Sequence, residues 1–140
     1  MIQRSPLPPG IRERLRTLGQ ALERCPQVVF AYLFGGAGTG ALQPLSDVDV
    51  AVYVDEGVDL LDTRLEVIGT VTSHLGTDEV DLVVLNTAPT ALVGRILQTR
   101  QVLLDREPFR RHRFESQALR EFLDFRIFEH RILAQRHARG

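Results

Sequence analysis

A short connection between two strand-like segments limits the folds open to this chain. Residues 28–34 read VVFAYLF, a continuous apolar run typical of a buried strand, and residues 47–54 read DVDVAVYV, which alternates as a strand with two different faces does. Only residues 35–46, which include Pro44, separate the two. A parallel pair needs a crossover that is usually a full helix, whereas an antiparallel pair needs only a short connection. We therefore expect antiparallel neighbours joined at one edge of a sheet.

Helical and strand-like patterns continue along the rest of the chain. Apolar residues recur at helical spacing from Ile11 to a stop at Cys25 and Pro26, and the same spacing returns in three later segments. The later predicted helices are residues 58–75, about 89–98 and 108–137, and the further predicted strands are residues 79–86 and 101–105. A length of 140 residues fits one domain. The sequence thus predicts a single α/β (α+β) domain over residues 1–140, in which helices flank a small mixed sheet behind a flexible leader, residues 1–9.

The last predicted helix, residues 108–137, carries apolar side chains around most of its circumference. A helix that covers one core needs an apolar stripe only about 100° wide. The excess apolar surface indicates that the helix either contacts a partner chain, which could be a second copy in an oligomer, or lies in a groove between layers of its own domain. Arg110, Arg111 and Arg113 form a basic cluster, which indicates a solvated face or a contact with a partner or RNA.

Composition excludes several classes of function. All 17 basic side chains are arginine, so the lysine of a GxxxxGK[ST] phosphate loop and lysine Schiff-base chemistry are both excluded. A net charge of -1 gives no bulk attraction to nucleic acid or anionic lipid. Cys25 is the only cysteine, and neither a signal-peptide pattern nor an apolar run of membrane-spanning length occurs. We expect a cytoplasmic protein without a membrane partner.

Residues 35–40, GGAGTG, admit three interpretations. The first is a flexible turn, which explains the glycines but not the aspartates that follow. The second is dinucleotide binding, because Gly36, Gly38 and Ala41 satisfy GxGxx[GA] after a strand; that fingerprint requires a crossover helix in a unit of about 30 residues, for which there is little room. The third is a phosphate-binding loop, in which glycines let backbone N–H groups close around a phosphate and a short helix near residues 38–43 adds a favourable dipole.

Carboxylates beside the loop favour the third interpretation. Asp47 and Asp49 point to the same side of one strand with Cα atoms about 7 Å apart, and their repulsion is unfavourable unless a cation lies between them. A pair of metal ions clamped about 3.5–4 Å apart needs a third carboxylate. Asp81 is the candidate, because the strand predicted over residues 79–86 would bring it beside Asp49 if the strands are neighbours. The sequence therefore predicts that these three aspartates hold Mg²⁺ against a triphosphate.

These residues resemble the signature of the nucleotidyltransferase superfamily that includes DNA polymerase beta, and most closely that of its minimal members, the MNT proteins. The signature is Gly-Ser, ten residues and Asp-x-Asp, written out as GSxAxGxxxxxSDxD. Its opening Gly-Ser pair falls on Gly35 and Gly36, and its later glycine on Gly40. Its closing Ser-Asp-x-Asp falls on Ser46, Asp47 and Asp49. The motif spans residues 35–49, and strand order and size extend the likeness over roughly residues 10–105.

The resemblance implies a nucleotidyltransferase fold, ATP as substrate and two Mg²⁺ ions. The residues that it implies are Asp47, Asp49 and Asp81 for catalysis and metal binding, and Gly35, Gly36 and Ser46 for nucleotide binding. Minimal members are commonly paired with a helical HEPN ribonuclease toxin, and some are antitoxins that transfer AMP from ATP to a tyrosine of that toxin. The resemblance therefore implies an antitoxin that neutralises a HEPN partner, with which the broadly apolar last helix is compatible.

One residue departs from the family pattern and keeps other functions open. Gly36 stands where the family has a serine whose hydroxyl helps to hold the nucleotide phosphate, and loss of such a bond to a charged group costs about 1.5–3 kcal/mol. In the expected reaction a hydroxyl attacks the α-phosphate in line and pyrophosphate leaves. Asp81 is expected to be the general base for that hydroxyl, or to orient another group that is the base. Ser46 is expected to cap the loop. The alternatives are an antitoxin that acts by binding alone and a transferase for a small molecule such as an aminoglycoside.

Overall fold

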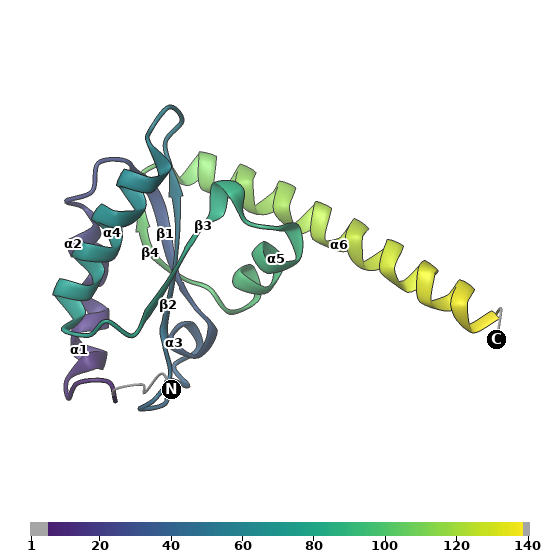
Figure 1. The fold of residues 1–140 in the computed structure, drawn as a ribbon. Coiled ribbons are helices and arrows are strands. Elements are labelled where there is room, and N and C mark those ends of the chain that lie inside the picture. Colours follow the sequence, from purple (N-terminus) through teal and green to yellow (C-terminus); the bar gives the residue numbers. More distant parts are fainter. Residues whose placement is uncertain (1–5, 139–140) are drawn as a thin grey trace.

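The computed structural model describes residues 6–138 and builds them around a four-stranded mixed sheet (Figure 1). The strands are β1 (Val28–Phe34), β2 (Val48–Val54), β3 (Val80–Val84) and β4 (Gln101–Asp105), in the spatial order β3-β2-β1-β4. β1 pairs antiparallel with β2 and β4, whereas β2 pairs parallel with β3. The predicted mixed sheet and the antiparallel pairing across the glycine-rich connection are confirmed.

Helices cover both faces of the sheet (Figure 1). They are α1 (Ile11–Arg16), α2 (Leu18–Leu22), α3 (Gly35–Thr39), α4 (Leu60–Leu75), α5 (Thr90–Thr99) and α6 (Pro108–Ala138), with a 3-10 turn η1 (Leu85–Thr87). The valines of β2 pack with α2 and α4 in one buried cluster, whereas Ala51 packs with residues of α5 and α6 in another. The predicted alternation of β2 therefore separates two hydrophobic cores, one on each side of the sheet.

The first helix is not continuous as predicted, because it breaks at Thr17 into α1 and α2. The Thr17 hydroxyl donates to the Arg14 carbonyl oxygen at 3.2 Å and lies 2.8 Å from Nε2 of His74 on α4. Such local side-chain bonds compete with the helical hydrogen-bond pattern. The apolar spacing gives no sign of the break, because Leu18 and Leu22 still reach the core.

The short helix in the glycine-rich segment lies earlier than the predicted residues 38–43. α3 follows β1 directly and ends at Gly40, whose φ of 78° is in the left-handed region that commonly terminates a helix. The residues that follow form the turn into β2. Gly36 and Gly38 are therefore part of the short helix, and Gly35 and Gly40 lie at its two ends with positive φ, so the glycines are not an open loop in front of a helix.

The strand predicted over residues 79–86 ends at Val84, where η1 begins. Asn86 in that turn bonds to both backbone groups of Val54: its amide nitrogen donates to the carbonyl at 2.8 Å, and its amide oxygen accepts from the N–H at 2.9 Å. The Asn86 side chain thus continues the pairing of β2 after the β3 backbone has turned away.

The long helix α6 has two different halves. Its first half packs on α5 and the sheet through Phe114, Ala118 and Phe122. Its second half extends away from the rest of the domain (Figure 1). The exposed apolar side chains there are Leu123, Phe125, Ile127, Phe128 and Leu133. A groove within the same domain therefore covers only part of the apolar surface of the first half, where Phe109 and Leu119 remain exposed, and the second half stays uncovered.

Residues 1–5 of the predicted flexible leader lie outside the described residues. In the remaining part, the Leu7 N–H donates to the Pro44 carbonyl at 2.8 Å, and the Leu7 side chain packs against the core on the α2 side. Within residues 6–138, no helix combines the length and the apolar character that crossing a membrane requires.

Candidate active site

The sheet places two of the predicted carboxylates side by side. Asp49 is the second residue of β2, and Asp81 is its partner in the parallel register with β3. On its other side Asp49 pairs with Phe34, the last residue of β1, so the carboxylate lies where the glycine segment begins. Asp49 is half-buried and Asp81 is exposed. The prediction that neighbouring strands bring Asp81 beside Asp49 is therefore correct for the backbone.

The charges of the three aspartates act on one another. The pKa of Asp49 is raised to about 6, first by burial, then by the negative charge of Asp81 and then by that of Asp47. Asp47 directly precedes β2 and is half-buried. The three side chains thus share one negative field at the end of β1, and ionising all of them together is unfavourable without a counter-charge.

The chemistry of this donor set fits a divalent cation. Carboxylate oxygens are the ligands that Mg²⁺ prefers, and a cation there would relieve the repulsion that raises the pKa of Asp49. No three histidine, cysteine, aspartate or glutamate side chains within residues 6–138 are gathered into a ready-made metal cluster. The carboxylates therefore match the ion in type and charge, without being already closed around a metal position.

Two glycines of α3 are required by close contacts. Gly35 has φ +62°, and a Cβ on it would lie 2.5 Å from Oδ2 of Asp49. A Cβ on Gly38 would collide with the Thr99 carbonyl oxygen and lie 3.0 Å from that of Leu33. The glycines therefore let the main chain lie directly against Asp49 and against the end of α5, and pliability is not their main role.

Gly36 is different, because there is space beside it. A Cβ on Gly36 would lie no closer than 3.4 Å to Ala41, which is an ordinary van der Waals distance. The structure would accept the serine of the family motif without moving the backbone. Ser46 lies in the turn before β2, where its N–H donates to the Gln43 carbonyl at 3.0 Å.

Thr99, the last residue of α5, also belongs to this region and was not predicted. Its Oγ1 accepts a hydrogen bond from the Gly35 N–H at 2.8 Å. The helical pattern of residues 89–98 indicates that α5 ends nearby, but no spacing in the sequence relates this hydroxyl to the glycine segment. Only the tertiary packing of α3 against α5 brings them together.

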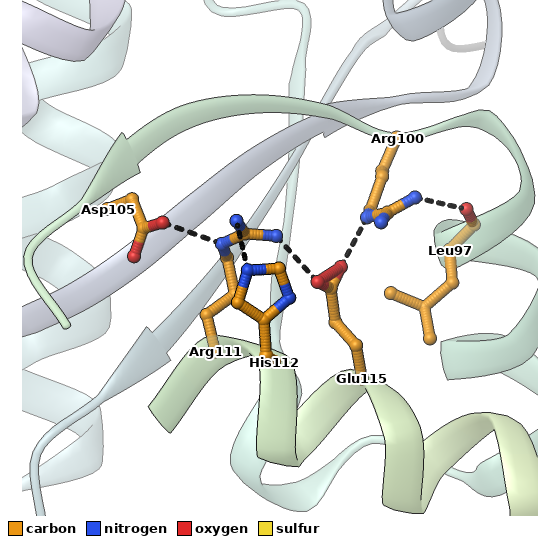
Figure 2. A network of polar contacts seen from close by, with 6 residues as sticks. All are labelled: Leu97, Arg100, Asp105, Arg111, His112 and Glu115. Atoms are coloured by element: carbon orange, nitrogen blue, oxygen red, sulfur yellow. Dashed lines mark hydrogen bonds and ion pairs between the residues drawn. The ribbon is translucent and has the colours of Figure 1, made fainter. Parts of the chain in front are cut away.

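A largely buried network of charged side chains joins α6 to Arg100, the residue after Thr99. Glu115 of α6, only 8% exposed, receives hydrogen bonds from Arg100 and from Arg111, the latter at 2.6 Å, and Arg111 also donates to Asp105 at 2.7 Å (Figure 2). The nearby Tyr32 hydroxyl is buried, and burial together with Glu115 raises the pKa of Tyr32 above its usual range. The arrangement couples β4, α6 and the α5–β4 junction.

The network changes the interpretation of the predicted basic cluster. Arg111 is committed to Asp105 and Glu115, and Arg110 pairs with Asp55 at 3.1 Å and with Glu107 at 3.3 Å. Both arginines are therefore neutralised by carboxylates of the same domain.

Comparison with known families and structures agrees with this architecture. The family described as Polymerase beta, Nucleotidyltransferase matches residues 16–109. A mutant of the MntA–HpeT toxin–antitoxin contains a chain similar in fold, with a TM-score of 0.71, 22% identity, and 86% of this chain and 96% of that chain covered. Comparison with curated proteins gave no match.

Two further similar structures carry a nucleotide or its product. One is the tri-AMPylated Shewanella oneidensis HEPN toxin in complex with an MNT antitoxin, with a TM-score of 0.66, 21% identity, and 89% of this chain and 97% of that chain covered. The other is a toxin–antitoxin with AMP-PNP, with a TM-score of 0.68, 24% identity, and 89% and 96% covered. At these identities the likeness establishes the fold.

Proposed function

Since the chain belongs to the polymerase beta nucleotidyltransferase family, we propose that it is a cytoplasmic antitoxin that transfers AMP from ATP to a hydroxyl, that of a tyrosine, on a HEPN ribonuclease toxin and thereby neutralises it. The observation that carries the proposal is the register pairing of Asp49 with Asp81 directly beside Gly35. This arrangement offers two carboxylates and a partly exposed stretch of main chain to one ligand. A nucleotide triphosphate with its divalent cations has the complementary charge and shape.

Different residues hold the metal ions, hold the phosphates and accept the proton in the proposed transfer. Two Mg²⁺ ions, held by Asp47, Asp49 and Asp81, would neutralise the phosphate charge and favour ionisation of the attacking hydroxyl. Gly35, Gly36 and Ser46 line the turn on which the phosphates lie. Asp81 accepts the proton of the attacking hydroxyl, whose oxygen forms a bond to the α-phosphorus as the bond to the pyrophosphate oxygen breaks. The exposed position of Asp81 suits this role, because the acceptor must arrive from solvent.

The similar structures support the choice of substrate and partner. Among them are an AMPylated HEPN toxin in complex with an MNT antitoxin and a toxin–antitoxin that contains AMP-PNP, a nucleotide with a triphosphate-like chain. The uncovered second half of α6 supplies a surface for such a toxin. The apolar side chains of this half stay exposed within residues 6–138, which agrees with a partner that binds there.

The test uses labelled ATP, Mg²⁺ and a HEPN-type toxin as the acceptor protein. The wild-type chain is expected to label the toxin, and Asp49→Asn is expected to abolish labelling. Asp78→Asn removes an exposed carboxylate three residues before Asp81 and is the matched control, which keeps full labelling. If Asp49→Asn labels the toxin as fast as wild type, the carboxylate site is not the transferase site.

A second function is favoured by one observation, the glycine at position 36. An antitoxin that had lost the serine hydroxyl would retain the toxin-binding surface and neutralise by occupation alone. In that case the toxin ribonuclease is inhibited at one-to-one stoichiometry, without ATP and equally by Asp49→Asn. Inhibition by a substoichiometric amount of the chain with ATP, and not without it, distinguishes the enzyme from the binding protein.

A further inference from the structure

The hydroxyl of Thr99 is held against the glycine segment by two contacts. Its Oγ1 accepts from the Gly35 N–H at 2.8 Å, and its carbonyl occupies the place where a Cβ on Gly38 would be. Thr99 is half-buried, and it is the last residue of α5, so its position is fixed by the packing of a complete helix. This hydroxyl therefore has a defined place in the site.

The hydrogen bond from Gly35 uses only part of what the Thr99 hydroxyl offers. A threonine hydroxyl can donate one hydrogen bond and accept two. Thr99 accepts from Gly35, and within residues 6–138 no acceptor takes its proton. The bond also fixes the orientation of the oxygen, so the O–H group must point away from the Gly35 N–H. The proton is therefore available to a ligand.

The position of that proton relative to the carboxylates defines the ligand. Gly35 lies between Thr99 and Asp49: its N–H bonds to the threonine, and its Cβ position lies 2.5 Å from Oδ2 of the aspartate. A ligand held by cations at Asp49 would thus present its anionic oxygens close to the hydroxyl. Hydrogen bonds from a hydroxyl to an ionised oxygen are among the stronger ones.

The glycine segment itself has no other hydroxyl free for this contact. Thr39 is its hydroxyl residue, and Thr39 donates back to the carbonyl oxygens of Gly35 and Gly36, at 3.3 and 3.4 Å. Gly36 has no side chain, although space exists beside it. Thr99, from a distant helix, thus adds a hydroxyl to this surface besides that of Ser46.

We propose that Thr99 is a nucleotide-binding residue whose hydroxyl donates to a phosphate oxygen of the bound nucleoside triphosphate. The inference rests on the proposed nucleotidyltransferase function and adds a contact to it. The contact is specific to the phosphate chain, so adenosine, which lacks phosphates, would not use it. Removing the hydroxyl should therefore weaken ATP binding about tenfold or more and leave adenosine binding unchanged.

The experiment measures binding, not turnover, by isothermal titration of Mg²⁺–AMP-PNP and of adenosine. Thr99→Val removes the hydroxyl and keeps the shape, and Thr99→Ser keeps the hydroxyl. The matched control is Thr90→Val, the same change at the opposite end of α5. The expected result is a loss of about tenfold or more in AMP-PNP affinity for Thr99→Val alone, with Thr99→Ser within about threefold of wild type.

A second variant separates ligand contact from a purely structural role. Gly36→Ser places a hydroxyl on the neighbouring residue, and in the double variant with Thr99→Val it should restore most of the lost affinity. Loss of the Gly35 bond lowers the melting temperature of Thr99→Val in either case, so the affinity decides: if Thr99 only holds Gly35 in place, Gly36→Ser restores none of the lost AMP-PNP affinity. That outcome overturns the inference, and a Thr99→Val variant that fails to fold counts as the same outcome.

The remaining outcomes separate this inference from the proposed function. If wild type and Thr99→Val bind AMP-PNP equally, the Thr99 contact is wrong while the nucleotidyltransferase site stands. If wild type binds no AMP-PNP but Gly36→Ser does, the natural chain lacks a sufficient phosphate contact and the inference is wrong. If neither binds, both the inference and the proposed function are wrong.

Discussion

Asp49 is ionised at neutral pH in surroundings that oppose its charge. Its pKa in the folded protein is about 6, above the ordinary value of 3.8, so the folded state holds the proton more tightly than the unfolded state does. Stability therefore falls as pH rises from about 4 through 6, and above pH 6 the full cost of the charged form is present. At neutral pH the charged carboxylate therefore lowers the stability of the ligand-free protein.

The first prediction is that Asp49→Asn stabilises the ligand-free protein. Because the carboxylate remains partly solvated, the gain at pH 7 is about 1 kcal/mol, less than the full pKa shift would give. The gain should shrink when unfolding is measured by urea titration at pH 4, where the wild-type carboxyl is mostly protonated. Asp78→Asn provides the control, for which no such gain is expected. A destabilised Asp49→Asn at pH 7 would contradict the electrostatic account.

The second prediction concerns the contact between Gly35 and Asp49. Both Gly35→Ala and Gly57→Ala place a side chain at positive φ, which costs about 1–2 kcal/mol. Only the first also places a methyl group against a carboxylate oxygen, whereas Gly57 has open space around it. Urea unfolding should therefore show an extra loss of at least about 1 kcal/mol for Gly35→Ala. Equal losses for the two variants would mean that the Asp49 side chain moves aside freely.

The sequence predicted part of the site for clear physical reasons. Adjacency of β2 and β3 brings Asp81 beside Asp49 in the register, because strand geometry has few choices once the pairing is known, whereas Asp47 lies just before β2. Thr99 lies 64 residues from Gly35 and meets it only through helix packing. No local pattern encodes such a contact, and neither the raised pKa of Asp49 nor the space at Gly36 follows from spacing.

At the scale of elements, the packing of α5 against α6 depends on one glycine. A Cβ on Gly94 of α5 would lie within the ring of Phe122, one of the buried residues of α6. The aromatic ring can lie this close to the α5 backbone only because Gly94 has no side chain. The first half of α6 is thereby attached to the domain, although most of the helix is exposed.

The third prediction is that Gly94→Ala destabilises the protein by about 1–3 kcal/mol, because Phe122 must leave its place. Gly69→Ala is the matched control, since Gly69 lies within α4 with nothing near its Cβ position. That control should stabilise by about 0.5–1 kcal/mol through helix propensity. Thermal unfolding followed by circular dichroism measures both, and a Gly94→Ala protein as stable as the control would contradict the packing described for Phe122.

The elements themselves were largely predictable, and the exceptions have a common cause. β1, β4, α5 and α6 lie within one or two residues of the expected positions, because apolar periodicity reports burial directly. The break at Thr17 and the end of β3 depend instead on side-chain bonds from Thr17 and Asn86 to distant backbone or side chains. Those bonds exist only in the assembled fold.

At the scale of the whole molecule, α6 presents apolar side chains that no part of the described domain covers. Ile127 and Phe128 are 51% and 62% exposed, so they add little to the stability of the isolated chain. Exposed apolar surface of this extent, on a helix that projects from the domain, indicates a protein partner. The exposed half and the buried half of the same helix should therefore respond differently to substitution.

The fourth prediction is that Ile127→Glu with Phe128→Glu abolishes capture of the HEPN toxin and leaves the free energy of unfolding within about 0.5 kcal/mol of wild type. Glu129→Gln, a neighbouring exposed change, should leave capture unchanged. Co-purification with tagged toxin measures the first effect and urea titration the second. Normal toxin capture by the double variant would place the interface elsewhere, and loss of folding would show that this half of α6 is covered.

Thr99 and Arg100 are consecutive residues, and they are anchored in opposite directions. The Thr99 hydroxyl accepts a hydrogen bond from the Gly35 N–H, while the Arg100 side chain donates to Glu115 of α6. One peptide unit thus joins α6 to the glycine segment. Under the proposed function, a toxin that shifted α6 would displace or strain this peptide. Toxin binding and nucleotide binding would then change each other's affinity by the same factor, as thermodynamic reciprocity requires.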